Sequence, residues 1–233
     1  MHTDRFTPLD AATLLRWMQH DLPNKQLFGI DRELFFMPKP DDPFRMERYG
    51  KVLETPLGVA AGPHTQLAQN ILSAWLCGAR YIELKTVQVL DELNVAKPCI
   101  DMADEGYNCE WSQELKLDQS FEEYLKAFVL LYVLRDMLNL PVEAEPGKGP
   151  GFIFNMSAGY NLEGIKSSAV QRFLDRMENA EEDVKRIKAG LAPLYPTIEK
   201  MPIPARVSDN LTFSNLNGCS KLVLERLWVN FIS

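Results

Sequence analysis

Short apolar runs alternate with longer helical stretches over most of the chain, and this alternation limits the folds open to it. Four runs are expected to form strands, because they are short, rich in β-branched or aromatic residues and closed by glycine or polar residues. They cover residues 56–62, 79–86, 151–157 and 206–214. Helical spacing of apolar residues predicts helices over residues 65–77, 121–140, 169–191 and 220–232. Strands that alternate with helices predict βαβ units and a parallel sheet.

The first fifty residues do not follow this alternation. They hold a predicted helix over residues 9–22 and a loop rich in Pro and Asp over residues 35–44. A complete (β/α)8 barrel needs about 250 residues, whereas the chain has 233. We therefore expect an N-terminal preamble at 1–50 and an incomplete TIM barrel of about four βα units at 51–233. The final apolar residues have no capping sequence, so we expect a truncated barrel.

Charge and composition argue against several kinds of partner. The net charge is −7, and the Lys and Arg residues are scattered among acids, which disfavours nucleic acid and anionic membrane as partners. We find no signal peptide and no apolar run near 18 residues, so a cytoplasmic protein is expected. The four cysteines are too widely spaced for a Cys-x-x-Cys metal site, and we expect free thiols and no metal. They are Cys77, Cys99, Cys109 and Cys219.

Small residues follow the first predicted strand. In parallel α/β folds, ligands lie at the carboxyl ends of the strands, so the residues after each strand carry the most information about function. Ala60, Ala61 and Gly62 would let a planar ligand approach the backbone, whose amides can bind its edge. The alternative is a tight turn that simply needs Gly62.

The second predicted strand ends in Lys85 and Thr86. A lysine at the end of an otherwise apolar strand is costly unless its ammonium group meets an anion or hydrogen-bond acceptors. The N1–C2=O edge of a flavin is one such partner. A salt bridge to Glu83 or Asp91, or extension of the lysine towards solvent, is the alternative.

Three further polar residues lie in or after predicted strands. Asn108, in the loop after the second strand, could bind the amide edge of a ligand or form an Asx-turn. Asn155 belongs to the third strand. Cys219 follows the fourth strand on a glycine-containing loop before a predicted helix, where a thiol with a lowered pKa could transfer protons. The alternative for this cysteine is a small buried apolar side chain.

Four segments together resemble the N-terminal domain of the family named selenate reductase iron–sulfur flavoprotein subunit. They are residues 56–66, 81–87, 106–111 and 155–165. That family is related to dihydropyrimidine and dihydroorotate dehydrogenases through its FMN barrel. The resemblance extends from about Phe6 to Cys219. It departs near the fourth strand, where the family's His-Gly-Cys-Pro-Pro is replaced by Asn-Gly-Cys-Ser-Lys at residues 217–221.

The resemblance implies an FMN-dependent oxidoreductase with a dihydroorotate dehydrogenase-like barrel. By that resemblance Cys219 would be the catalytic acid/base. The residues expected to bind the flavin or face the substrate are Ala60, Ala61, Gly62, Lys85, Thr86, Asn108 and Asn155.

The family resemblance also implies partners. They would be a small-molecule substrate and other redox domains or subunits, with FAD, NAD(P)H and 4Fe-4S clusters in parts of the longer family proteins. The alternative to an enzyme is a non-catalytic remnant or a fragment that docks on a partner. Two half-barrels could also complete each other as a homodimer.

Overall fold

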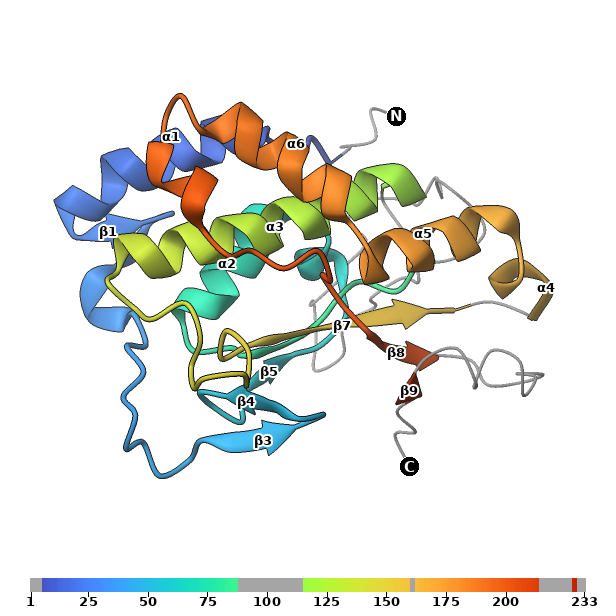
Figure 1. Cartoon of the computed structure of the whole chain (residues 1–233), viewed down its shortest axis with the longest axis horizontal. Helices are drawn as coiled ribbons and strands as arrows, with labels where there is room; N and C mark the ends of the chain where they lie inside the picture. Colours follow the sequence, from blue (N-terminus) through green and yellow to red (C-terminus); the bar gives the residue numbers. More distant parts are fainter. Residues whose placement is uncertain (1–5, 88–114, 160–161, 214–227, 230–233) are drawn as a thin grey trace, which may run out of the picture.

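A five-stranded parallel sheet forms the centre of the computed structural model, which describes residues 6–87, 115–159, 162–213 and 228–229 (Figure 1). The strands lie side by side in chain order. They are β5 (Gly58–Val59), β6 (Tyr81–Glu83), β7 (Ile153–Ala158), β8 (Asn210–Phe213) and β9 (Trp228–Val229). Parallel neighbours joined by helices are the repeating unit of a (β/α) barrel. The predicted α/β class with a parallel sheet is therefore confirmed.

The longer helices lie on one side of this sheet (Figure 1). They are α1 (Ala11–Asp21), α2 (Ala68–Leu76), α3 (Leu117–Met137), α5 (Ser168–Glu178) and α6 (Glu181–Leu191). Shorter helical elements are η1 (Leu22–Asn24), η2 (Arg32–Leu34), η3 (Pro63–Thr65), α4 (Leu162–Ile165) and η4 (Pro196–Lys200). Helices α1 and α6 contact each other and α3, and they form an outer layer over it. In a barrel the opposite face of the sheet is the interior.

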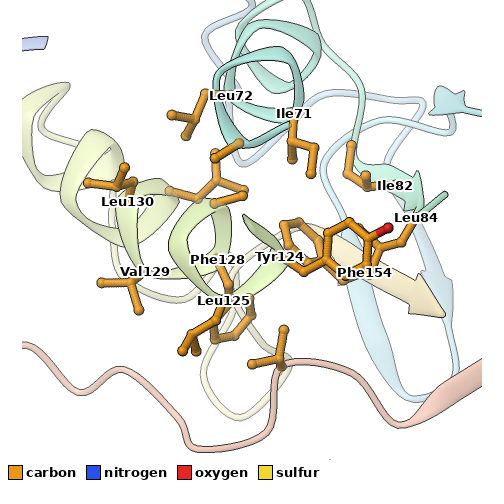
Figure 2. Close-up of a cluster of buried hydrophobic side chains, with 14 of the residues drawn as sticks. Ile71, Leu72, Ile82, Leu84, Tyr124, Leu125, Phe128, Val129, Leu130 and Phe154 are labelled. Atoms are coloured by element: carbon orange, nitrogen blue, oxygen red, sulfur yellow. The ribbon is translucent and has the colours of Figure 1, made fainter. Parts of the chain in front are cut away.

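The hydrophobic core lies between the sheet and helices α2 and α3 (Figure 2). Ile82 of β6, Leu84 just after it and Phe154 of β7 are buried against Ile71 and Phe128 of the helices. Full burial of one such side chain contributes about 1.5–3 kcal/mol. Helix α3 is buried on nearly all sides because other helices surround it, so its apolar residues show no single stripe.

Two antiparallel hairpins precede the sheet. The first joins β1 (Gln26–Leu27) to β2 (Ile30–Asp31), and the second joins β3 (Met46–Arg48) to β4 (Lys51–Leu53). The second turns through Tyr49 and Gly50, both with positive φ, as a tight hairpin turn requires. The boundary predicted at residue 50 falls within this hairpin and stays a prediction. Helix α1 confirms the helix predicted over residues 9–22.

Two predicted helices were wrong in part. The helix predicted over residues 169–191 is two helices, α5 and α6, separated at Asn179 and Ala180. Asn179 is extended, and the amide of Ala180 donates to a carbonyl in the segment before β8 rather than within a helix. The helix predicted over residues 220–232 contains strand β9 instead, where an aromatic and a β-branched residue suit pairing with β8. The rest of that range lies outside the described residues.

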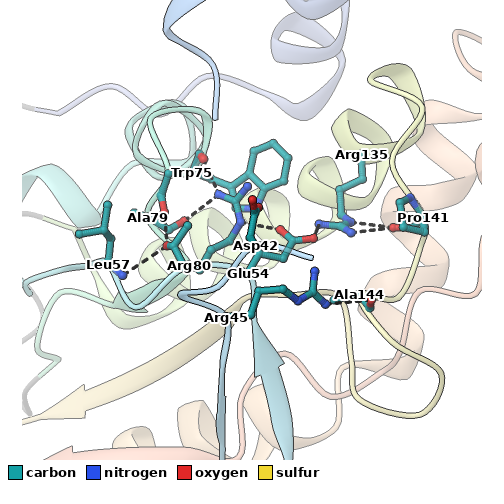
Figure 3. Close-up of polar contacts among 12 residues, drawn as sticks. Asp42, Arg45, Glu54, Leu57, Trp75, Ala79, Arg80, Arg135, Pro141 and Ala144 are labelled. Carbon is teal, nitrogen blue, oxygen red and sulfur yellow. Dashed lines mark hydrogen bonds and ion pairs between the residues drawn. The ribbon is translucent and has the colours of Figure 1, made fainter. Parts of the chain in front are cut away.

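A buried ionic cluster stands at the amino end of the sheet (Figure 3). The Glu54 carboxylate accepts from Arg80 Nε at 2.7 Å and from Arg135 Nη1 at 2.9 Å, and all three side chains are almost fully buried. Arg80 also stacks over the ring of Trp75, 4.2 Å from its centroid, and Arg135 donates twice to the Pro141 carbonyl. The amino end of a barrel sheet contributes to stability rather than to catalysis, so this cluster has a structural role. The cluster ties β4, β6 and α3 together.

Candidate functional site

The carboxyl ends of β5, β6 and β7 bring several predicted site residues to one edge of the sheet. Ala60 follows β5 and is exposed, Ala61 is half-buried, and Lys85 follows β6 with only 6% of its surface exposed. Asn155 lies within β7 and is completely buried. Parallel strands end at the same edge, so Ala60, Ala61 and Lys85 lie at one edge of the sheet, and their role in a ligand site stays a prediction.

Gly62 takes part in the turn that follows β5. Its amide donates to Thr65 Oγ1 at 3.1 Å, and the same hydroxyl donates to the Gly62 carbonyl. A side chain at Gly62 would meet the His64 ring at 2.5 Å. The backbone groups of Gly62 are therefore used within the turn. Its predicted role beside a ligand stays a prediction.

A β-bulge interrupts the pairing of β6 with β7 at Lys85 and Thr86. Glu83 pairs with Asn155, whereas the next bridge joins Val87 to Ala158, so the β6 side has one residue more between these two points. Bulges recur next to active sites because they re-aim side chains. Here the bulge lets Thr86 Oγ1 meet Ser157 at 2.8 Å.

Without the bulge, the Thr86 side chain would lie on the other face of the sheet. Ile82 and Leu84 are buried among the helices, and a regular strand would place Thr86 on their face. The hydrogen bond to Ser157 instead places Thr86 on the face that carries Asn155. The bulge thus adds a hydroxyl group to the polar face of the sheet.

Helix α3 holds the main chain at Lys85 in place. The hydroxyl of Tyr124, itself completely buried, donates to the Lys85 carbonyl at 3.0 Å. Desolvation raises the pKa of the Tyr124 hydroxyl far above its ordinary value, so it remains a donor. This bond satisfies a carbonyl that the bulge removes from the regular ladder.

Asn155 is the centre of a polar network across three strands. Its Nδ2 donates to Glu83 Oε2 of β6 at 2.8 Å, to Thr212 Oγ1 of β8 at 2.7 Å and to the Met156 carbonyl at 3.0 Å. Burial raises the pKa of the Glu83 carboxyl to about 7, while hydrogen bonds from Thr212 and Asn155 act in the opposite direction. A carboxyl group that titrates near neutral pH therefore lies beside a predicted site residue.

The sequence interpretation did not assign Glu83, Thr212 or Ser157 to the site. A usable signal was present for Glu83, because Tyr81, Glu83 and Lys85 alternate with apolar residues along one strand. Thr212 and Ser157 are ordinary strand residues, and only the register of β7 with β8 brings them together.

Two predicted site residues cannot be placed. Asn108 and Cys219 lie outside the residues that the structure describes. Within the described ranges, no group of three or more His, Cys, Asp or Glu residues could hold a metal ion. In the same part of the chain, no helix combines the length and apolar character needed to cross a membrane.

A cavity of about 720 Å³ lies elsewhere, near the amino ends of β7 and β8. Its walls include Phe128 and Tyr132 of α3, Phe152 and the segment 202–209. Active sites of (β/α) barrels lie at the opposite, carboxyl end. We therefore place the candidate site at the carboxyl edge rather than in this cavity.

Residues 28–233 match the family described as oxidoreductase YgfK, N-terminal TIM-barrel domain. The chain belongs to this family. It is 40% identical over 222 residues to the protein named "Putative oxidoreductase YgfK" in Escherichia coli K12, and equally to its counterpart in E. coli O157:H7. Each match covers 87% of this chain but 21% of the relative.

Membership of the YgfK family accounts for the parallel sheet. The family's N-terminal domain is a TIM barrel, and the described part of the chain shows strands of such a barrel in consecutive order. The chain spans about a fifth of the length of its curated relatives and corresponds to the N-terminal domain of that family.

Proposed function

We propose that this domain binds FMN at the carboxyl edge of its sheet and serves flavin-dependent oxidoreduction. The bulge carries the proposal, because it brings the buried Lys85 and the Thr86–Ser157 hydroxyl pair to the edge where barrels bind ligands. A cation there suits the N1–C2=O edge of an isoalloxazine ring, which becomes anionic on reduction.

The described residues fit such a ring in size and polarity. Ala60 and Ala61 have the smallest side chains that a strand end can offer short of glycine, and Ala60 is exposed. Asn155, Thr86 and Ser157 supply hydrogen-bonding groups on the adjacent strands. Bound FMN would supply hydride transfer, and the protein would bind the ring and set its orientation and electrostatics.

The family resemblance extends the proposal beyond the ring. It favours a small heterocyclic or oxyanion substrate, with Asn108 facing the ligand and Cys219 moving a proton. It also favours electron exchange with other redox domains of a longer protein.

A binding experiment with lumiflavin tests the proposal, since lumiflavin presents the ring without the phosphate. Titration of the purified chain, followed by flavin fluorescence, should show saturable binding that Lys85→Met weakens about tenfold or more. Lys85→Arg should keep part of the affinity. Lys185→Ala is the matched control, because Lys185 is exposed on α6 and pairs only with local glutamates among the described contacts.

Circular dichroism and thermal unfolding establish that each variant is folded. A folded chain that binds neither lumiflavin nor FMN at millimolar concentration would overturn the proposal. Equal affinity of the Lys85→Met variant and the original chain would remove Lys85 from the site.

A further inference from the structure

The cavity near the amino ends of β7 and β8 has the size and lining of a small-molecule site. Its volume of about 720 Å³ lies within the usual range of ligand pockets, about 300–1,000 Å³. The described residues of the proposed flavin site do not line it, so the two are separate. Four buried aromatic rings form part of its wall, and they belong to Phe128, Tyr132, Phe152 and Phe154.

The aromatic part of the wall is rigid, because the rings pack against one another. The centroid of the Phe128 ring lies 5.3 Å from that of Tyr132, and the rings of Phe152 and Phe154 also meet it edge to face. Each ring is thus held by its neighbours whether or not a ligand is present. A planar ligand could bind without a rearrangement of the wall, which lowers the free-energy cost of binding.

The wall also contains a hydroxyl group that has no hydrogen-bond partner among the described residues. It belongs to Tyr132, whose surface is only 5% exposed. Burial raises the pKa of this hydroxyl above its ordinary value, so it stays protonated and can donate. Buried hydroxyl groups are normally hydrogen-bonded, and a polar atom on a ligand would supply the partner that the described protein does not.

Two cations of the wall converge on one carboxylate. Lys51 Nζ donates to one oxygen of Asp209 at 2.8 Å, and Arg206 Nη1 donates to the other at 3.3 Å. Among the described contacts, these side chains form hydrogen bonds with no other residue, although an ammonium group has three N–H donors and a guanidinium group has five. Most of these donors are therefore available to a second anion.

Glu143 is the other acid in the described wall, and it is already bound to its own loop. Its carboxylate accepts from the amide of Gly147 at 2.9 Å. Gly149 of the same loop lies against the Lys51 side chain, since a Cβ atom there would be 3.8 Å from Lys51 Cγ. The wall thus carries two acids and two cations. Both acids are engaged, whereas both cations keep unused donors.

We propose that this cavity is a second ligand site, which binds a small aromatic carboxylate. The ring would lie against the aromatic wall with its far end towards the Tyr132 hydroxyl, and the carboxylate would accept from Lys51 and Arg206. The site does not depend on the proposed flavin site, because it lies at the opposite end of the sheet.

Titration with 2-naphthoate tests the proposal, with 2-naphthamide as the uncharged analogue of nearly the same size. Calorimetry on the folded chain should show saturable binding of 2-naphthoate, about tenfold tighter than that of 2-naphthamide. Arg206→Met and Lys51→Met should each bring this ratio towards one. Equal affinity for the two compounds, tighter binding of 2-naphthylmethylamine, or no binding of 2-naphthoate at millimolar concentration overturns the proposal.

Control variants establish where the anion binds. Lys148→Met removes a cation from the same loop, but Lys148 pairs with Glu47 and is not among the described residues of the wall, so the ratio should stay as in the original chain. Lys85→Met, at the other end of the sheet, should also leave it unchanged. A fall in either variant as large as that in Arg206→Met would place the anion elsewhere and overturn the proposal. The Arg206 side chain is 62% exposed, so this variant decides if Lys51→Met does not fold.

A third ligand tests the orientation of the ring. 6-Hydroxy-2-naphthoate carries a hydroxyl group at the end opposite its carboxylate and should bind about threefold or more tightly than 2-naphthoate, as expected for one added hydrogen bond. This gain should vanish in Tyr132→Phe, which keeps the ring and removes no hydrogen bond described in the fold. A gain that survives in Tyr132→Phe overturns this placement of the ligand.

Discussion

Arg80 and Arg135 donate to opposite oxygens of a single carboxylate, that of Glu54. Arg80 precedes β6 and Arg135 lies in the last turn of α3, so one buried anion links the start of a strand to the end of a helix. Burial lowers the pKa of the Arg80 guanidinium to about 10, and Glu54 opposes this effect, so Arg80 stays charged at neutral pH.

Replacing Glu54 by Gln should therefore be strongly destabilising. The substitution leaves two buried guanidinium groups without a counter-ion, and the expected loss is about 3–5 kcal/mol of unfolding free energy. Urea denaturation measures it. Glu47→Gln is the matched control, since Glu47 pairs with Lys148 at the surface and should cost less than about 1 kcal/mol. Similar losses in the two variants would contradict this account.

Gly151→Ala should be much more costly than Gly147→Ala. Both glycines have positive φ, +84° and +71°, so each alanine pays about 1–2 kcal/mol for the left-handed backbone. A Cβ atom at Gly151 would also come within 2.5 Å of the Glu54 carboxyl carbon, which two arginines hold in place, whereas Gly147 faces open space. The difference in unfolding free energy should exceed about 1 kcal/mol, and thermal unfolding of both variants checks it.

Glu83→Gln should stabilise the protein in a pH-dependent manner. The folded state raises the pKa of Glu83 from 4.5 to about 7, so it binds a proton that the unfolded state releases between these values. The contribution of Glu83 to stability therefore falls as pH rises from 4.5 through 7, by up to about 3 kcal/mol. The gain in Glu83→Gln should be small at pH 5 and largest at pH 8.5. Urea denaturation at both values compares the two proteins, and an equal difference at both would contradict the raised pKa.

Tyr124→Phe should make the bulge at Lys85 and Thr86 less stable. The substitution removes the hydrogen bond to the Lys85 carbonyl and leaves a buried acceptor without this partner, at a cost of about 1–3 kcal/mol. Amide hydrogen exchange should rise at Val87 and its neighbours, while exchange within α2 stays nearly constant. Unchanged protection at the bulge would show that Tyr124 does not hold it.

The parallel sheet and the lysine at its edge could be predicted from sequence because both depend on local pattern. Tyr81 to Lys85 alternate along one strand, and Lys85 ends it. The bulge could not be predicted, because it exists only as a difference in register between β6 and β7. The contact of Glu83 with Asn155 joins residues 72 positions apart, and no local signal encodes it.

The division between α5 and α6 escaped prediction for a related reason. Residues 169–191 keep helical spacing throughout, so the pattern alone favours one helix. The separation is made by a long-range bond, in which Ala180 N donates to the Ala205 carbonyl at 2.8 Å. Tertiary contacts override local preference at such points.

The extra residue at Lys85 and Thr86 divides residues 81–87 into two segments whose contacts are with different parts of the fold. Up to Leu84, each side chain is constrained by the helices or by β7, and a change there alters stability. Beyond it, Tyr124 anchors the main chain to α3, and the Thr86 hydroxyl contacts Ser157 rather than a helix. We therefore expect relatives to vary more at Thr86 than at Leu84 or Val87, which both belong to the core. Deleting one residue at 85–86 would remove the bulge and restore regular pairing with β7. Substitutions at the site would then also alter the packing of the core.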